Sequence, residues 1–235
     1  MTKSLAIIPA RGGSKRIPQK NMKLFLDKPI IEYSINAALQ CSHIDRVIVS
    51  TDDPKIAEIA KNAGADVPFM RSNDNSSDYA GLSEVALEVL EQLDSQGDKY
   101  DNFCLILATA PFISNKSLNE SFNLLSDSKS DAIIPVVQYS FPIQRAFKVS
   151  KQKLEMFSPE NMKVRSQDLE PAYHDAGQYY WLKTDSFLKE KKIYLNNSTP
   201  YILEERYSQD IDTPEDWLIA EMKFKMMLSE EHLKD

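Results

Sequence analysis

The segment of the sequence richest in potential chemistry is residues 11–23, RGGSKRIPQKNMK, with five basic residues and no acidic one. Backbone N–H groups, the Ser14 hydroxyl and several cations can converge there on one anion, and a polyphosphate needs many such donors. The adjacent Gly12 and Gly13 are informative because the whole chain has six glycines. Because this basic segment directly follows an apolar run, a polyphosphate site is favoured over the alternative, a solvated basic loop.

This segment matches neither common nucleotide-binding fingerprint. It lacks the Gly-x-x-x-x-Gly-Lys-Ser/Thr pattern, which excludes a P-loop. It also lacks Gly-x-Gly-x-x-Gly, so a dinucleotide site is not supported. Any phosphate site here is therefore of another kind.

A second candidate lies near the end of the chain, where Asp210 and Asp212 flank Ile211. Residues two apart on an extended segment face the same side. Two carboxylates on one side can hold Mg²⁺, which prefers oxygen ligands. The alternative for Asp212 is a helix cap, because Pro214 suits the first turn of a helix.

The elements that must position these residues alternate along the chain. Short apolar runs predict strands, and apolar residues at a spacing of three or four predict helices. The predicted strands are 4–9, 46–50, 65–69, 103–107, 132–137 and 177–182. The predicted helices are 29–41, 52–63, 81–93, 115–125 and 214–228.

Such alternation predicts an α/β fold of a single domain, 1–235, with a doubly wound, mostly parallel sheet in a Rossmann-like three-layer arrangement. Ligands of such sheets bind at the carboxyl ends of the strands, which directs attention to the loops after Pro9, Ser50 and Leu107. The pattern weakens over residues 139–173, where we expect an excursion from the sheet, a hairpin arm that meets a second subunit.

Composition excludes several classes of protein. The chain has 235 residues and a formal net charge of −7, which argues against nucleic acid as a partner. No stretch approaches the roughly 20 apolar residues that span a bilayer, so we expect no membrane association. Cys41 and Cys104 lie in apolar surroundings without a Cys-x-x-Cys pair, which predicts two buried reduced thiols. These features together predict a cytoplasmic protein.

Five motifs, in order over nearly the whole chain, resemble the acylneuraminate cytidylyltransferases, which make CMP-activated nine-carbon sugar acids. They are IIPARGGSKRIPQKN, VIVSTDDPKIAEIAKNAGADV, SSDYA, ATAPF and QDIDTPEDW. The resemblance implies a nucleotide-diphospho-sugar transferase-like fold. It also implies transfer of CMP from CTP to the anomeric C2 hydroxyl of a nonulosonic acid, with Mg²⁺ as cofactor, release of pyrophosphate, and a homodimer.

The resemblance also implies roles for individual residues. Arg11, Lys20 and Asp212 are the implied catalytic residues, and Asp210 and Asp212 the implied metal ligands. The implied nucleotide-binding residues are Ala10, Arg11, Gly12, Gly13, Ser14 and Asn21 for phosphates and ribose, with Arg71 and Ser77 near the cytosine. The alternative for this last segment is a surface loop in which Asp78 caps the next helix.

The identity of the sugar acid depends on two departures from the sialic acid enzymes. Leu107 stands where those enzymes commonly have a glutamine, and a leucine cannot hydrogen-bond a sugar hydroxyl. The stretch RSQDLEPAYHDAG is similar to the pseudaminic acid cytidylyltransferases, whose acceptor is less hydroxylated. The resemblance makes Leu107, Arg165, Gln167 and His174 sugar-binding candidates, although a lone histidine is as often structural.

Pseudaminic acid is therefore the expected acceptor, and its product would suit glycosylation of bacterial surfaces or flagellin. The nearest alternatives are a CMP-N-acetylneuraminate or CMP-legionaminate synthetase, or a sugar-1-phosphate nucleotidyltransferase. A different class is a nucleotide-binding regulatory protein without turnover. The joint presence of Arg11, Lys20 and the two aspartates argues against that class.

Overall fold

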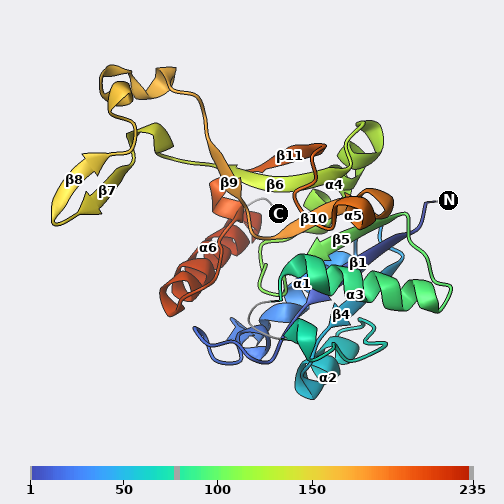
Figure 1. Cartoon of the computed structure of the whole chain (residues 1–235). Helices are drawn as coiled ribbons and strands as arrows, with labels where there is room; N and C mark the ends of the chain where they lie inside the picture. Colours follow the sequence, from blue (N-terminus) through green and yellow to red (C-terminus); the bar gives the residue numbers. More distant parts are fainter. Residues whose placement is uncertain (1, 77–79, 233–235) are drawn as a thin grey trace.

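The computed structural model describes residues 2–76 and 80–232 (Figure 1). A seven-stranded sheet runs through the molecule in the order β11-β6-β10-β5-β1-β4, and β9 also pairs with β6. Its strands are β1 (Ser4–Pro9), β4 (Arg46–Ser50), β5 (Asn102–Ile106), β6 (Ala132–Gln138), β9 (Tyr173–Asp175), β10 (Tyr179–Lys183) and β11 (Ser198–Leu203). Pairing is parallel between β11 and β6, β5 and β1, and β1 and β4, whereas β10 is antiparallel to both its neighbours and β9 to β6.

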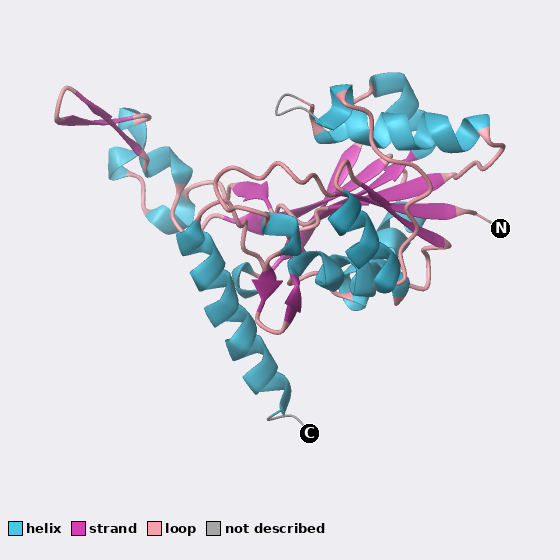
Figure 2. Ribbon diagram, turned by 90° about the horizontal axis from the view of Figure 1, so that it is seen from below, coloured by secondary structure: helices cyan, strands magenta, loops and turns pink. Residues whose placement is uncertain are grey.

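Helices cover both faces of this sheet, which makes three layers (Figure 2). On one face lie α1 (Ile30–Leu39), α2 (Pro54–Asn62) and α4 (Asn115–Asp127), and on the other α3 (Leu82–Ser95) and α5 (Thr184–Glu190). The predicted α/β fold with a three-layer, mostly parallel sheet is confirmed.

Side-chain alternation along the central strands explains why two helical layers are needed. In β1, Ala6 and Ile8 join the core against α1 and α2, whereas Leu5 and Ile7 join the core against α3. All four are fully buried. Successive side chains of a strand point to opposite faces, so a strand that is apolar throughout must be covered twice.

A third apolar cluster lies beside the sheet and joins the two ends of the chain. The hairpin of β2 (Leu24–Phe25) and β3 (Lys28–Pro29) packs on α6 (Pro214–His232). The Phe25 ring meets Trp217 and Phe224 edge to face, with centroids 5.6 Å apart in both pairs. This packing anchors the basic loop, which directly precedes β2, to the C-terminal helix.

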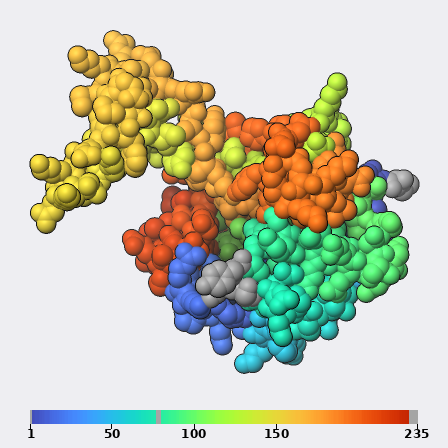
Figure 3. All heavy atoms as spheres, in the orientation of Figure 1, coloured from blue at the N-terminus to red at the C-terminus, as the bar shows by residue number. Residues whose placement is uncertain are grey.

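Between β6 and β9 the chain leaves the body as an arm, which we define as residues 139–172 (Figure 3). It carries the hairpin β7 (Phe147–Ser150) and β8 (Lys153–Met156) and three short 3-10 turns, Ile143–Arg145, Pro159–Lys163 and Ser166–Asp168. Arg145 donates to the Val164 carbonyl, and Gln144 donates to the Glu170 carbonyl at 2.8 Å. The expected hairpin excursion is thus present.

The sequence predicted one element that is absent and missed several that are present. The predicted strand over 65–69 is wrong: that segment makes a single bridge, Asp66 with Ile48, and no further ladder with β4. The missed elements include the β2–β3 hairpin, β9, α5 and β11. In the described part of the chain, no helix is both long and apolar enough to cross a bilayer.

Candidate active site

A cavity of about 320 Å³ opens at the carboxyl ends of β1 and β5, where ligands of such sheets bind. Basic side chains of the loop after β1 line one side, and the first turn of α3 lines another. The lining residues are Pro9, Arg11, Ser14, Lys15, Arg16, Ile17, Lys20, Asn21, Arg71, Ala80, Gly81, Leu82, Val85, Leu107, Ala108 and Thr109.

Backbone and side-chain bonds hold the loop after β1 in place. The Gly12 N–H donates to Asp52 Oδ1 at 2.9 Å, and the Asn21 side chain donates to the Arg11 carbonyl at 2.9 Å. A Cβ on Gly12 would lie 2.5 Å from Asp53 Oδ2, closer than two such atoms can approach. Gly13 has open space instead. A side chain at the first position of the pair would therefore force Asp53 or the loop to shift.

Arg71 lies at the base of the cavity and is almost fully buried. Its guanidinium donates to Ser50 Oγ at 3.0 Å and to the Ser50 carbonyl at the end of β4. Burial lowers the pKa of Arg71, and the Asp52 and Glu88 charges oppose that effect. The last residue of β4 thus holds the Arg71 guanidinium, and the loop after β4 holds the Gly12 backbone through Asp52.

Asp212 lies against the same basic loop. Arg16 contacts Asp212 Oδ1 at 2.8 Å, and Lys20 Nζ lies 3.4 Å from that oxygen. The alternative role as helix cap is wrong: Thr213 Oγ1 accepts from the Asp216 N–H at 3.2 Å, and Asp216 Oδ2 accepts from the Thr213 N–H at 2.7 Å. Because Thr213 and Asp216 cap α6, the Asp212 carboxylate is left to face the cations.

Asp210 keeps some surface exposed, yet the protein atoms around it raise the pKa of its carboxyl, and the Asp212 charge raises it further. Two carboxylates so placed repel one another. The pair therefore places two carboxylates next to a loop suited to phosphate, with Arg16 and Lys20 at Asp212.

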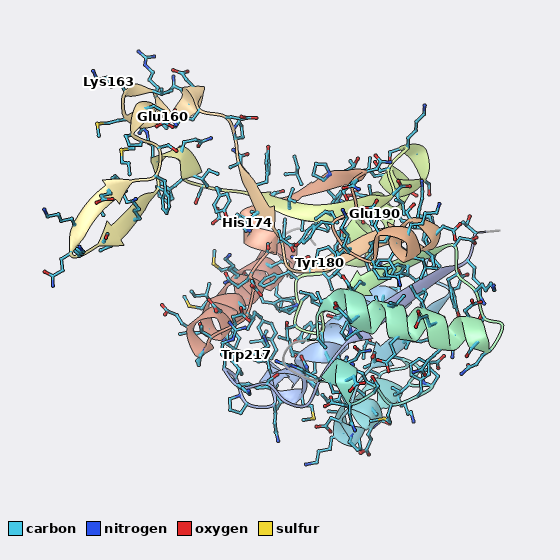
Figure 4. All side chains as sticks on the ribbon, viewed as in Figure 1. Glu160, Lys163, His174, Tyr180, Glu190 and Trp217 are labelled. Atoms are coloured by element: carbon cyan, nitrogen blue, oxygen red, sulfur yellow. The ribbon has the colours of Figure 1, made fainter. Side chains whose placement is uncertain are left out.

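The predicted sugar-binding residues are divided between the cavity and the arm. Leu107 lines the cavity. His174 lies on β9 at the base of the arm, where its Nδ1 is 2.8 Å from the Asp175 carbonyl oxygen and its ring lies 4.9 Å from the Tyr139 ring (Figure 4). Arg165 and Gln167 lie on the arm, and neither lines the cavity of its own chain.

Comparison with known proteins agrees with this geometry. A model of the cytidylyltransferase family matches residues 5–233. The chain belongs to this family. It is 40% identical over 225 residues to a pseudaminic acid cytidylyltransferase of Campylobacter jejuni, covering 95% of this chain and 97% of that protein. It is 31% identical to a CMP-N,N'-diacetyllegionaminic acid synthase of Legionella pneumophila, covering 92% and 94% of the two chains.

Among solved structures, a CMP:2-keto-3-deoxy-manno-octonic acid synthetase complexed with CTP matches with a TM-score of 0.71 and 18% identity, covering 97% of this chain and all of that one. A 4-diphosphocytidyl-2C-methyl-D-erythritol synthase from Anaerococcus prevotii matches with a TM-score of 0.65 and 14% identity, covering 95% and 99% of the two chains. Both likenesses concern the fold.

The acidic pair of this cytidylyltransferase fits a magnesium ion to which the protein contributes only one or two ligands. Within residues 2–76 and 80–232, no group of three or more His, Cys, Asp or Glu side chains could hold a metal. Mg²⁺ commonly takes one or two carboxylates, with substrate phosphates and water completing its shell. The two carboxylates of Asp210 and Asp212 beside the phosphate loop meet that requirement.

Half of the predicted nucleotide-binding residues of this cytidylyltransferase line the cavity. They are Arg11, Ser14, Asn21 and Arg71, and the predicted catalytic residue Lys20 lines it with them. Three others lie in the same loop without lining it: Ala10, Gly12 and Gly13. Ser77 and Asp78 lie outside the described residues.

Sequence reasoning missed the wall formed by the start of α3, with Gly81, Leu82 and Val85. Gly81 is the N-cap of α3. The sequence signal for this wall was a glycine, which has no side chain, at the start of the predicted helix 81–93. The N-terminus of a helix carries partial positive charge, which suits an anionic ligand. The orientation of Arg16, which contacts Asp212, was likewise unreadable from the sequence.

Proposed function

We propose that this chain transfers CMP from CTP to the anomeric C2 hydroxyl of a nonulosonic acid, with pseudaminic acid as the preferred acceptor. The single observation that carries the proposal is the cavity in which Arg11, Ser14, Lys20 and Arg71 converge with the apolar Leu107. Family membership and the Campylobacter relative's name support the choice of reaction and acceptor.

In the proposed reaction the C2 hydroxyl oxygen bonds to the α-phosphorus of CTP, and the bond from that phosphorus to the bridging oxygen breaks. Pyrophosphate leaves with that oxygen, and the hydroxyl proton passes to a base. Catalysis of phosphoryl transfer consists mostly of positioning and charge neutralisation. Arg11 and Lys20 would offset the charge on the transferring and leaving groups, and Arg71 would orient the nucleotide.

Asp210 and Asp212 would hold Mg²⁺ in this proposal. When bound, the ion would supply positive charge to the phosphates. Lys20 and Arg16 already contact Asp212, so these side chains keep the carboxylate close to the phosphate loop. Their contribution is to fix the carboxylate before the ligands arrive.

Leu107 supports pseudaminic acid over the more hydroxylated N-acetylneuraminic acid. An apolar wall leaves a substrate hydroxyl without a partner, and an unpaired buried polar group costs about 1–3 kcal/mol. A legionaminic acid cytidylyltransferase is the second candidate, because the Legionella relative covers the chain almost as fully.

We further propose a homodimer in which the arm meets a second copy. The arm exposes many large apolar side chains, among them Phe141, which is 81% exposed, and Val149, which is 75% exposed. An isolated two-stranded hairpin is marginally stable in water. Arg165 and Gln167 would then serve the cavity of the partner, which would account for their absence from their own.

Pyrophosphate release with CTP, Mg²⁺ and a panel of pseudaminic, legionaminic, N-acetylneuraminic and 3-deoxy-octulosonic acids tests the proposal. We expect turnover with pseudaminic acid to exceed turnover with each of the others. Preference for N-acetylneuraminic acid would overturn the role of Leu107. CTP binding without turnover on any acid would favour the nucleotide-binding regulatory protein.

A further inference from the structure

The carboxylate of Asp175 is a meeting point of three hydrogen-bond donors. Its Oδ1 accepts from the Gly177 N–H at 2.8 Å. Its Oδ2 accepts from the Tyr180 hydroxyl at 2.5 Å and from the Tyr194 hydroxyl. Bonds to an ionised acceptor are roughly twice as strong as bonds between neutral groups. Asp175 thereby ties the end of β9 to β10 and to the segment after α5.

These bonds fix a turn of unusual backbone conformation, residues 176–178. Gly177 has a backbone φ of +62°, a value that residues other than glycine rarely adopt. The Ala176 carbonyl accepts from Ser208 Oγ at 3.0 Å in a buried bond, and the Gln178 side chain donates to the Tyr207 carbonyl at 2.5 Å. The turn is therefore bonded to the chain that leads directly into Asp210.

Two residues of the site lie next to this turn. A Cβ placed on Gly177 would come within 3.7 Å of the Asp210 side chain, so the turn passes close to that carboxylate. On the other side, the Leu107 N–H donates to the Gln178 carbonyl at 2.8 Å. The turn lies between the apolar wall of the cavity and the acidic pair. Figure 4 shows Tyr180 in the body of the protein and His174 at the base of the arm.

We propose that Asp175 is a positioning residue that, through the Gly177 turn, holds the Asp210 carboxylate in place to receive the metal. Asp175 itself touches neither metal nor substrate in this proposal. The inference rests on the proposed function, since the metal role of Asp210 is part of it. Outer partners that orient a metal ligand typically change metal affinity by about 10–100-fold when removed.

The test compares the affinity of the full-length protein for MnCTP with its affinity for CTP in EDTA, both by isothermal titration calorimetry without acceptor. We expect Asp175→Asn to weaken MnCTP binding about tenfold and to leave metal-free CTP binding within about twofold of the parent. A merely structural role would change both affinities together, or the melting temperature alone.

Two tyrosine variants provide a matched pair. Tyr194→Phe removes one donor to Asp175, and we expect it to weaken MnCTP binding about threefold, the effect of one lost hydrogen bond. Tyr201→Phe also removes a tyrosine bond to a carboxylate, that of Glu120 at 2.6 Å, outside the cavity. We expect it to bind MnCTP like the parent.

Unchanged MnCTP affinity in a folded Asp175→Asn protein would overturn the inference. If that variant fails to fold, Tyr194→Phe decides, and equal affinities in both tyrosine variants would overturn it. Asp212→Asn separates this failure from failure of the proposed function. If Mn²⁺ strengthens CTP binding equally in the parent and in Asp212→Asn, the metal role of the acidic pair is wrong, and the inference fails with it.

Discussion

Lys20 and Asp212, which are 192 residues apart in sequence, meet at the edge of the cavity. Lys20 Nζ donates to the Ile211 carbonyl at 2.6 Å and lies 3.4 Å from Asp212 Oδ1. The Lys20 side chain is 19% exposed, so water screens this contact less than it screens the one from the exposed Arg16. The phosphate loop and the acidic pair are therefore one electrostatic unit, assembled before any ligand binds.

The first prediction is that Asp212→Asn lowers turnover by about 100-fold or more, and that Arg11→Ala does the same, as expected for groups that act on charge in the transition state. Pyrophosphate release at saturating substrates measures the effect. Glu215→Gln is the control, since it neutralises an exposed carboxylate three residues further along. Turnover of Asp212→Asn within tenfold of the parent would show that the carboxylate is not part of the machinery.

The paired glycines give a second prediction with its control built in. Gly12→Ala places a Cβ 2.5 Å from Asp53 Oδ2, so the loop, the Asp53 side chain or the start of α2 must shift. We expect a loss of about 1–3 kcal/mol in the free energy of unfolding, typical of overpacking, and weaker CTP binding. Gly13→Ala adds a methyl group where no protein atom lies within 4 Å and should leave the free energy of unfolding unchanged. Equal effects in chemical denaturation of the two variants would contradict this account.

How much of the fold the sequence predicts depends on how local the signal is. The strand Ser4–Pro9 and the strand Arg46–Ser50 were predicted to the residue because both are continuous apolar runs. The segment 65–69, ADVPF, is also mostly apolar, but its single bridge to Ile48 shows that apolar character does not ensure pairing. The edge strand β11 escaped prediction because it is half-exposed and contains Pro200.

For the site, the sequence identified groups whose chemistry is concentrated in one loop, such as Arg11 and Lys20. It could not tell whether Asp212 caps a helix. That depends on which side chain accepts hydrogen bonds from the free N–H groups of the first helical turn, and Thr213 is the residue that does so. The sequence assigned no role to Asp175, although it lies in the stretch RSQDLEPAYHDAG. Its partners Tyr180 and Tyr194 reach it only because the folded chain brings β10 and the segment after α5 next to β9.

A third prediction concerns alkaline pH and the contact between Tyr194 and Asp175. Burial, the hydrogen bond to Asp175 and its charge raise the pKa of Tyr194 from 10.0 to about 12. The unfolded chain therefore releases this proton at lower pH than the folded protein. The contribution of Tyr194 to stability is complete below pH 10 and is lost as the pH rises toward about 12.

We accordingly expect the free energy of unfolding of Tyr194→Phe to fall less steeply than that of the parent between pH 10 and about 12. Urea denaturation at a series of pH values measures both slopes. Other tyrosines and lysines titrate in both proteins, so the difference between the slopes isolates this hydroxyl. At pH 8 the two slopes should coincide, and identical slopes above pH 10 would mean that the hydroxyl does not sense Asp175.

The last prediction concerns the arm. Val149 lies on β7 and is 75% exposed, so its side chain is free to pack on a second copy. Val149→Asp would place a charge in that contact, and we expect light scattering to give 26.8 kDa, the mass of one chain, where the parent gives about twice that. Lys151→Glu, at the turn of the same hairpin, alters charge without removing apolar surface and should leave the mass unchanged.

If Arg165 and Gln167 serve the partner's cavity, the Val149→Asp monomer should bind CTP like the parent but lose turnover. A parent protein with the mass of a single chain would contradict the dimer, and full turnover in a monomeric variant would return the sugar-binding role to residues of the body.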